Sequence, residues 1–287
     1  MKVVLFCGGL GMRLRDYAEN VPKPMVPLDY RPILWHLMKY YAHFGHTDFI
    51  LCLGYRGDLI KRYFLNDDEH SSGEAVLYEG GRRRETLNGD TVSWRITFAD
   101  TGLEANIGER LMAVRRHLAG EEMFLANYAD GLTDLYLPDQ IEHMRARDSV
   151  ASFLAVKPNL SYHFLNATDD GVVTSFRDIA HSGLRVNGGF FVFRQEIFDY
   201  MRAGEELVER PFQRLMDQGR LLAYQHDGFW VPMDTAKDKQ RLDALVESGN
   251  PPWYIWRDAT PRPRIATVGR RDQPATSDTA TRAAASL

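Results

Sequence analysis

The opening of the chain constrains its fold most, because a short apolar run leads directly into a glycine-rich turn. Residues 3–6 read Val-Val-Leu-Phe, and residues 8–14 read Gly-Gly-Leu-Gly-Met-Arg-Leu. The run is typical of a buried strand, and glycines let backbone N–H groups approach an anion closely. Arg13 supplies positive charge, as does Lys23, which stands between two prolines. The pattern predicts a phosphate-binding loop at the end of a first strand.

Two better-known phosphate loops do not match this segment. A dinucleotide-binding fingerprint would have a third glycine where Leu14 stands, which disfavours a nicotinamide-dependent oxidoreductase. A Walker loop would continue with Gly-Lys and then Ser or Thr. A plain structural turn has no need of Arg13, nor of Lys23 held in an extended backbone by its flanking prolines. The phosphate-binding interpretation is therefore the favoured one.

The rest of the chain alternates between strand-like and helix-like segments. An amphipathic helix is expected over residues 32–41, a strand over 48–53 and a helix over 57–65. The same alternation returns from residue 108 to residue 156 and again after residue 193. This order predicts an α/β fold, with a Rossmann-like, three-layer, mostly parallel sheet covered by helices on both faces.

Two segments depart from this rhythm. Residues 66–107 are polar and glycine-rich with an alternating run at 92–98, and we expect a β-rich hairpin insertion there. Its three arginines at 82–84 suit contact with a phosphate or with a partner subunit. The favoured interpretation is that they lie in a solvated loop and bind neither. Residues 258–287 are rich in Pro, Thr, Ala and Arg and are expected to form a disordered tail. The predicted domain is thus residues 1–257.

Composition excludes several classes of protein. The 287 residues carry a net charge of −4, which disfavours a nucleic-acid-binding protein. The two cysteines, Cys7 and Cys52, fall in apolar runs, so a disulfide framework is not expected and a reducing cytoplasm fits. No apolar run reaches membrane-spanning length, and the opening run is too short for a signal peptide. We expect a cytoplasmic protein with no membrane partner.

Two aspartates stand where predicted strands end. Asp130 follows the expected strand at 123–126, and Asp234 lies between an aromatic strand and a helix. Each has a simpler interpretation, an Asp-Gly turn for Asp130 and a helix N-cap for Asp234. Considered together they suit Mg²⁺, which takes one or two carboxylates plus phosphate oxygens. His36, by contrast, falls within the amphipathic helix and is expected to be packed rather than catalytic.

These stretches together resemble the sugar-1-phosphate nucleotidyltransferase family, and within it the glucose-1-phosphate cytidylyltransferase branch. The resemblance runs in order from residue 1 to residue 256. The matching stretches are residues 8–14, 22–26, 31–36, 54–57, 100–102, 130–131, 187–191, 228–235 and 252–256. It implies a glycosyltransferase-A-like fold and the Mg²⁺-dependent transfer of a nucleotidyl group to a sugar 1-phosphate. The leading candidate for the nucleotide donor is CTP. Related enzymes are oligomers, so the resemblance implies a homo-oligomer.

The resemblance also implies roles for individual positions. Arg13 and Lys23 would be catalytic, and Asp130 and Asp234 would hold Mg²⁺. The sugar site would be lined by Asn187, Gly188 and Glu209. The implied nucleotide-binding residues are Leu5, Gly8, Gly9, Gly11, Arg13, Arg110 and Asp130.

The departures from the family pattern concentrate on the acceptor side. The family has a Glu-Lys-Pro whose lysine binds the sugar phosphate, whereas this chain has Arg177-Asp178-Ile179. Arg177 is therefore the candidate for that phosphate, although arginine and lysine are not interchangeable. Two alternatives stay open: a nucleotidyltransferase with an acceptor other than glucose 1-phosphate, and a non-catalytic protein that binds a nucleotide or a sugar phosphate.

Overall fold

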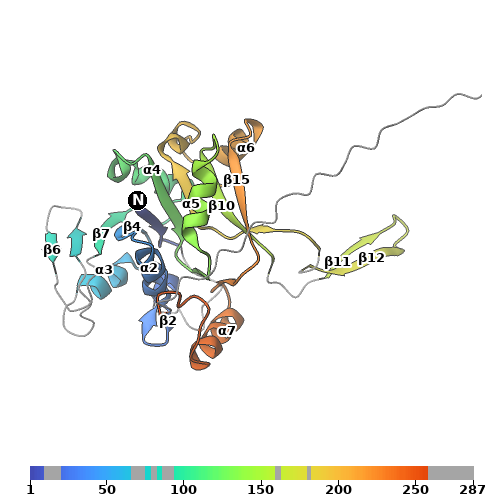
Figure 1. Ribbon diagram of the computed structural model, residues 1–287, viewed down its shortest axis with the longest axis horizontal. Helices are drawn as coiled ribbons and strands as arrows, with labels where there is room; N and C mark the ends of the chain where they lie inside the picture. Colours follow the sequence, from blue (N-terminus) through green and yellow to red (C-terminus); the bar gives the residue numbers. More distant parts are fainter. Residues whose placement is uncertain are drawn as a thin grey trace, which may run out of the picture. The chain divides into compact units, whose positions relative to one another are not determined.

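Parallel strands form the centre of a ten-stranded sheet in the computed structural model of the protein (Figure 1). The central strands are β1 (Val3–Phe6), β4 (Asp48–Leu53), β7 (Arg95–Asp100) and β8 (Met123–Tyr128). They lie in the order β8-β1-β4-β7, and each neighbouring pair is parallel. The expectation of an α/β fold around a mostly parallel sheet is confirmed.

The structure describes residues 1–9, 21–65, 75–78, 83–85, 94–158, 163–179 and 182–257, with the backbone alone for 75–78 and 83–85. Met1–Arg257 form one compact unit. Two predicted site residues, Gly11 and Arg13, lie outside the described residues, as does the tail 258–287. None of the described helices is both long enough and apolar enough to cross a membrane.

Antiparallel strands extend the sheet on both sides of this centre. Beyond β8, strand β14 is antiparallel to both β8 and β10, and β10 in turn pairs with β13 and β15. Beyond β7, strand β5 is parallel to β7 and antiparallel to β6. The bounds are β5 Ala75–Tyr78, β6 Arg83–Glu85, β10 Ala151–Val156, β13 Val186–Asn187, β14 Phe191–Arg194 and β15 Leu221–His226.

Strand β7 corrects one expectation about the segment 66–107. The alternating run at 92–98 predicted a hairpin insertion rather than a βαβ unit, but Arg95–Asp100 pairs in parallel along its whole length with β4. Ile96 and Phe98 are buried in the core. Alternating polar and apolar residues do not distinguish a strand of a local hairpin from a strand that pairs with a distant one. The partner residues of β4 lie 47 positions earlier in the sequence. Among the described residues of this segment, only β5 and β6 pair as a hairpin.

Helices cover both faces of the sheet, and side chains alternate between two cores. On β1, Val3 and Leu5 pack with α2, α3, α5 and α7, whereas Val4 and Phe6 pack with α4 and α6. Each such buried side chain stabilises the fold by about 1.5–3 kcal/mol. The bounds are α2 Ile33–His43, α3 Gly57–Leu65, α4 Ile107–Ala113, α5 Leu137–Arg145, α6 Arg210–Asp217 and α7 Ala236–Glu247, with 3₁₀ turns Lys23–Met25, Arg115–Leu118 and Gln195–Asp199.

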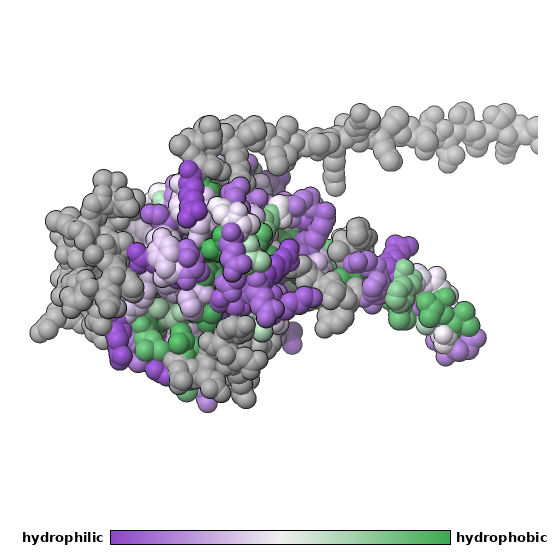
Figure 2. All heavy atoms as spheres, turned by 90° about the horizontal axis from the view of Figure 1, so that it is seen from below, coloured by the Kyte–Doolittle hydropathy of each residue, from purple (hydrophilic) through white to green (hydrophobic). Residues whose placement is uncertain are grey.

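Three small ladders complete the described part of the chain. They pair β2 (Pro27–Leu28) with β3 (Arg31–Pro32), β9 (Gly131–Thr133) with β16 (Trp230–Pro232), and β11 (His163–Ala167) with β12 (Val173–Asp178). The β11–β12 hairpin exposes large apolar side chains, among them Leu165 and Phe176, and Figure 2 shows apolar atoms gathered on it at the right of the view.

His36 is packed on α2, as expected, and it should make the fold sensitive to acid. Its Nε2 lies 3.0 Å from the Leu28 carbonyl oxygen, its ring stacks on Tyr254, and burial lowers its pKa to about 4. In the unfolded chain the pKa is near 6.5, so as the pH falls below that value the unfolded state binds a proton that the folded state does not. As the pH falls from 7 to 5, this lowers the free energy of unfolding by about 2 kcal/mol.

Urea denaturation at several pH values checks this expectation. His36→Gln keeps a donor near the Leu28 carbonyl but does not titrate. The difference in stability between pH 7 and pH 5 should therefore be smaller in this variant than in the wild type. Equal pH dependence of the two proteins would contradict the assignment to His36.

Candidate active site

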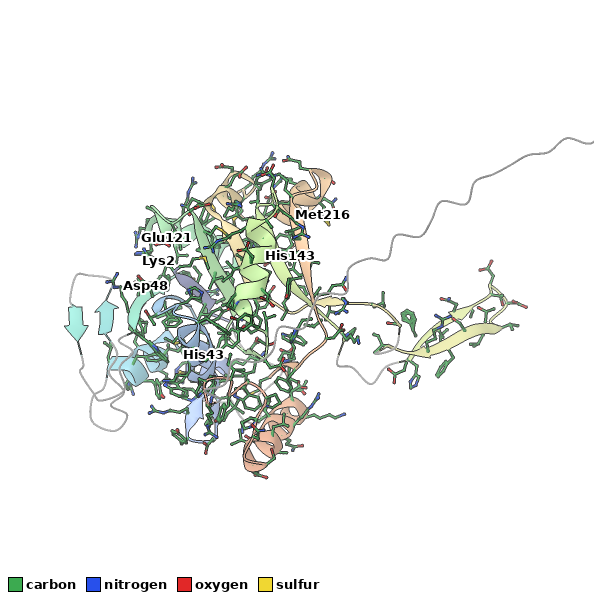
Figure 3. The ribbon with its side chains drawn as sticks, in the orientation of Figure 1. Lys2, His43, Asp48, Glu121, His143 and Met216 are labelled. Carbon is green, nitrogen blue, oxygen red and sulfur yellow. The ribbon has the colours of Figure 1, made fainter. Side chains whose placement is uncertain are left out.

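Several of the predicted site residues lie at one edge of the sheet, where the parallel strands end. Gly8 follows β1, and Asp130 follows β8. The opposite edge is marked in Figure 3 by Lys2, Asp48 and Glu121, which stand at the starts of β1, β4 and β8. Ligands of open α/β sheets bind beyond the carboxyl ends of the strands. The candidate site therefore lies at the edge that such folds use.

Lys23 is held between two carboxylates at this edge. Its Nζ donates a hydrogen bond to Asp130 Oδ2 and lies 2.6 Å from Asp234 Oδ1. Lys23 begins a short 3₁₀ turn after Pro22, whose backbone is extended, and its side chain is only 14 % exposed. The proline-framed segment thus delivers a nearly buried ammonium group to both aspartates, which the sequence had separated by more than a hundred residues.

A small ladder explains how the two aspartates meet. Strand β9 directly follows Asp130, β16 closely precedes Asp234, and these strands pair with Gly131 opposite Pro232. The Met233 N–H also donates to the Asp130 carbonyl oxygen at 2.9 Å. Thr235, not Asp234, is the N-cap of α7, where it forms a capping box with Asp238. The simpler interpretation of Asp234 as a cap is therefore wrong.

The electrostatics of this group favour a charged lysine. Burial acts against the ammonium form of Lys23, but Asp130 and Asp234 outweigh it and raise its pKa above the ordinary lysine value. Two carboxylates converging on one cation are an oxygen donor set that suits Mg²⁺. Among the described residues no group of three or more His, Cys, Asp or Glu side chains is placed to hold a metal ion. A metal here would take its remaining ligands from phosphate and water, as Mg²⁺ commonly does.

Arg110 is buried beneath the glycine turn and organises its backbone. The guanidinium donates to the carbonyl oxygens of Gly8 and Leu53 at 3.2 Å, to Thr101 Oγ1 at 2.7 Å, and to the carbonyls of Gly102 and Leu103. It packs so closely that a Cβ atom on Gly8 would lie 2.0 Å from its Nη1 atom. Sequence reasoning missed this structural role because all these acceptors belong to the backbone or to distant loops. A direct contact with a nucleotide stays a prediction.

The other predicted nucleotide-binding residues differ in accessibility. Of the two described glycines in the turn, Gly8 is buried and Gly9 is exposed, so Gly9 offers an open backbone position. The Leu5 side chain is completely buried in the core and offers a nucleotide no side-chain contact. The period-two alternation of β1 directs this side chain towards α2, so a nucleotide contact would have to come from the backbone of Leu5, and its role stays a prediction.

The predicted sugar-site residues fall into two groups. Asn187 ends β13, and Gly188 follows it. Asn187 Oδ1 accepts from the Gly189 N–H and the Gly188 carbonyl accepts from Trp230 Nε1, both at 2.9 Å. Trp230 lies on β16, which leads to Asp234. Sequence reasoning missed the role of this tryptophan, whose indole joins the Asn187 segment to the strand before Asp234.

Glu209 and Arg177 are not brought to the lysine. Glu209 is exposed just before α6, and Arg177 is exposed on β12 opposite Phe164. Within the part of the chain that the structure describes, no hydrogen bond or ion pair joins either side chain to Lys23 or its two aspartates. Their roles in sugar binding stay predictions.

A lysine held between two aspartates at the ligand edge of a parallel sheet is typical of an α/β enzyme that acts on phosphate groups. Comparison with known proteins identifies the family. The chain belongs to the family described as nucleotidyl transferase, whose model matches residues 2–258.

The similar proteins agree with this assignment. The chain is 38% identical over 258 residues to a glucose-1-phosphate cytidylyltransferase of Salmonella typhi, covering 89% of this chain and 100% of that protein. It is 32% identical over 259 residues to a probable glucose-1-phosphate cytidylyltransferase of Bacillus subtilis, with the same coverage of each. The structure of HddC from Yersinia pseudotuberculosis aligns with a TM-score of 0.61 at 20% identity, over 85% of this chain and 99% of that one. The fold is therefore that of the glycosyltransferase-A-like nucleotidyltransferases.

Proposed function

We propose that this nucleotidyltransferase transfers a cytidylyl group from CTP to a sugar 1-phosphate, first of all glucose 1-phosphate, and releases pyrophosphate. The observation that carries the proposal is the position of Lys23 between Asp130 and Asp234, beside the turn that follows β1. The choice of CTP and of glucose rests on the relatives named as glucose-1-phosphate cytidylyltransferases.

The proposed reaction needs charge neutralisation more than proton transfer. An oxygen of the sugar phosphate forms a bond to the α-phosphorus of the triphosphate. The bond from that phosphorus to the bridging oxygen breaks, and pyrophosphate leaves with the electron pair. The attacking phosphate is already ionised, so no general base is required. The ammonium group of Lys23, kept charged by its two carboxylates, stabilises the negative charge that builds up on the α-phosphate.

Asp130 and Asp234 would hold Mg²⁺ in the loaded enzyme. Their carboxylates already converge on one cation, the ammonium group of Lys23, which is why the pair fits a divalent ion. When bound, the ion would neutralise phosphate charge and help to orient the triphosphate. Arg13, Gly9 and Gly11 would supply further contacts to the triphosphate, as the family resemblance implies.

A pyrophosphate-release assay tests the function. The protein is incubated with Mg²⁺, glucose 1-phosphate and each of the four common ribonucleoside triphosphates in turn, and we expect the highest kcat/KM with CTP. Activity with CTP but only with another sugar phosphate would support the alternative acceptor, which the replacement of Glu-Lys-Pro by Arg177-Asp178-Ile179 favours. Ligand binding without pyrophosphate from any pair would support the non-catalytic alternative instead.

We also propose that the protein acts in the cytoplasm as a homo-oligomer, with neither nucleic acid nor a membrane as partner. The free and buried Cys7 and Cys52 support a reducing compartment, and the net charge of −4 argues against nucleic acid. Exposed apolar side chains on β11 and β12 support contact with a second copy.

A further inference from the structure

Three charged side chains meet at the carboxyl ends of β10 and β15, away from the lysine site. Asp227 Oδ1 lies 2.9 Å from Arg185 Nη2 and 3.1 Å from Lys157 Nζ. Lys157 directly follows β10, Asp227 directly follows β15, and Arg185 directly precedes β13. The cluster holds two cations and one carboxylate, so its formal charge is positive.

The fold fixes Arg185 and leaves part of its guanidinium available. Its Nη1 donates to the carbonyl oxygens of Ala155 and His226, both at 3.1 Å, and thereby joins the ends of β10 and β15. A guanidinium has five N–H donors, and the described residues accept three of them. Lys157 is 59% exposed and pairs only with Asp227 among the described residues. Both cations therefore have donors that remain for a ligand.

This cluster lies at the same edge of the sheet as the lysine site. Strands β8 and β10 are both antiparallel to β14, so they run in the same direction, and their carboxyl ends share one edge. Arg185 stands two residues before Asn187, which pairs with Ala155 on β10. The two cations thus flank the segment for which the sequence predicted sugar binding.

We propose that Arg185 and Lys157 bind the phosphate of the sugar 1-phosphate acceptor, in place of the lysine that the family motif supplies. This inference rests on the proposed function. A phosphate monoester carries between one and two negative charges at neutral pH, which suits a preorganised guanidinium beside an ammonium group. Arg177, the candidate from the sequence, is exposed on a hairpin whose ladder joins β11 and β12 alone. Arg185 is instead held by two strand carbonyls at the ligand edge.

Steady-state kinetics of Lys157→Gln and Arg185→Gln test the proposal. Each variant should raise the KM for the sugar 1-phosphate about tenfold, the effect of one charge-assisted hydrogen bond, and leave the KM for CTP unchanged. Arg194→Gln is the matched control. Arg194 also donates to a backbone carbonyl, that of Ser149 just before β10, and to an exposed carboxylate, that of Glu122, but at the opposite edge of the sheet. Its KM for the sugar 1-phosphate should stay at the wild-type value.

Several outcomes would overturn the proposal. An unchanged acceptor KM in Lys157→Gln, whose exposed side chain can be removed without disturbing the fold, would show that the cluster is only a structural ion pair. An equal rise in both KM values would show a general electrostatic effect. A selective rise in Arg177→Gln, with Lys157→Gln at the wild-type value, would move the phosphate to the β12 hairpin.

Failure of the proposed function is distinguished by a separate measurement. If the wild type releases no pyrophosphate with any pair of substrates, isothermal titration calorimetry with inorganic phosphate still reports on this cluster. Binding by the wild type that is lost in both Lys157→Gln and Arg185→Gln, but not in Arg194→Gln, would support an anion site. Binding that all four proteins share would overturn it.

Discussion

Asp130→Asn is expected to lower kcat about 10³-fold. The change removes the negative charge that would hold Lys23 and Mg²⁺, the two groups proposed to neutralise the triphosphate. The carboxylate of Asp130 is one of two that hold Lys23 in place and in its charged form. It is also one of the two proposed Mg²⁺ ligands. The change keeps the size of the side chain and one acceptor oxygen, so the fold should be retained. The measurement is pyrophosphate release at saturating CTP and sugar 1-phosphate over a range of Mg²⁺ concentrations.

Asp48→Asn is the matched control for this prediction. Asp48 also pairs with a cation, Arg95 at 3.3 Å, but it begins β4 at the opposite edge of the sheet. We expect near-normal kcat in this variant. If Asp130→Asn retained kcat within a fewfold of the wild type at every Mg²⁺ concentration, the assignment of Lys23, Asp130 and Asp234 as the reaction centre would be wrong.

Arg110→Met should be among the most destabilising single changes outside the apolar core, with a loss of about 3 kcal/mol in the free energy of unfolding. The variant keeps a long side chain but leaves four backbone carbonyls and the Thr101 hydroxyl without their buried donor. It also leaves the Gly8 carbonyl with only the long 3.4 Å hydrogen bond from the Tyr55 N–H among the described residues, so the turn after β1 should lose its fixed geometry. We therefore expect a higher KM for CTP together with the loss of stability.

Urea denaturation and steady-state kinetics measure the two effects of this change. Arg110→Lys keeps the charge but replaces five fixed donors by three mobile ones, so it should recover only part of the stability. A variant with normal stability but a raised KM for CTP would show that Arg110 contacts the nucleotide directly, as the family resemblance implied. Normal values of both quantities would contradict the structural role.

Local patterns in the sequence predicted much of the fold. The strand Asp48–Leu53 and the helix Gly57–Leu65 have the bounds expected from apolar periodicity. Periodicity works here because each pattern reports which side of one element faces the core. It did not work for Arg95–Asp100, since a polar and apolar alternation does not state whether the partner strand is adjacent in sequence or far away.

The sequence by itself determined the kinds of groups at the site: a glycine turn after a strand, a lysine framed by prolines and two aspartates at strand ends. These are properties of short segments, because glycine and proline act on the backbone at their own and neighbouring positions. Only the tertiary structure decided which groups meet. The β9–β16 ladder joins Asp130 to Asp234 across more than a hundred residues, and Arg110 and Arg185 bind carbonyls of distant strands. Such contacts depend on how the strands are ordered in the sheet, which no single segment specifies.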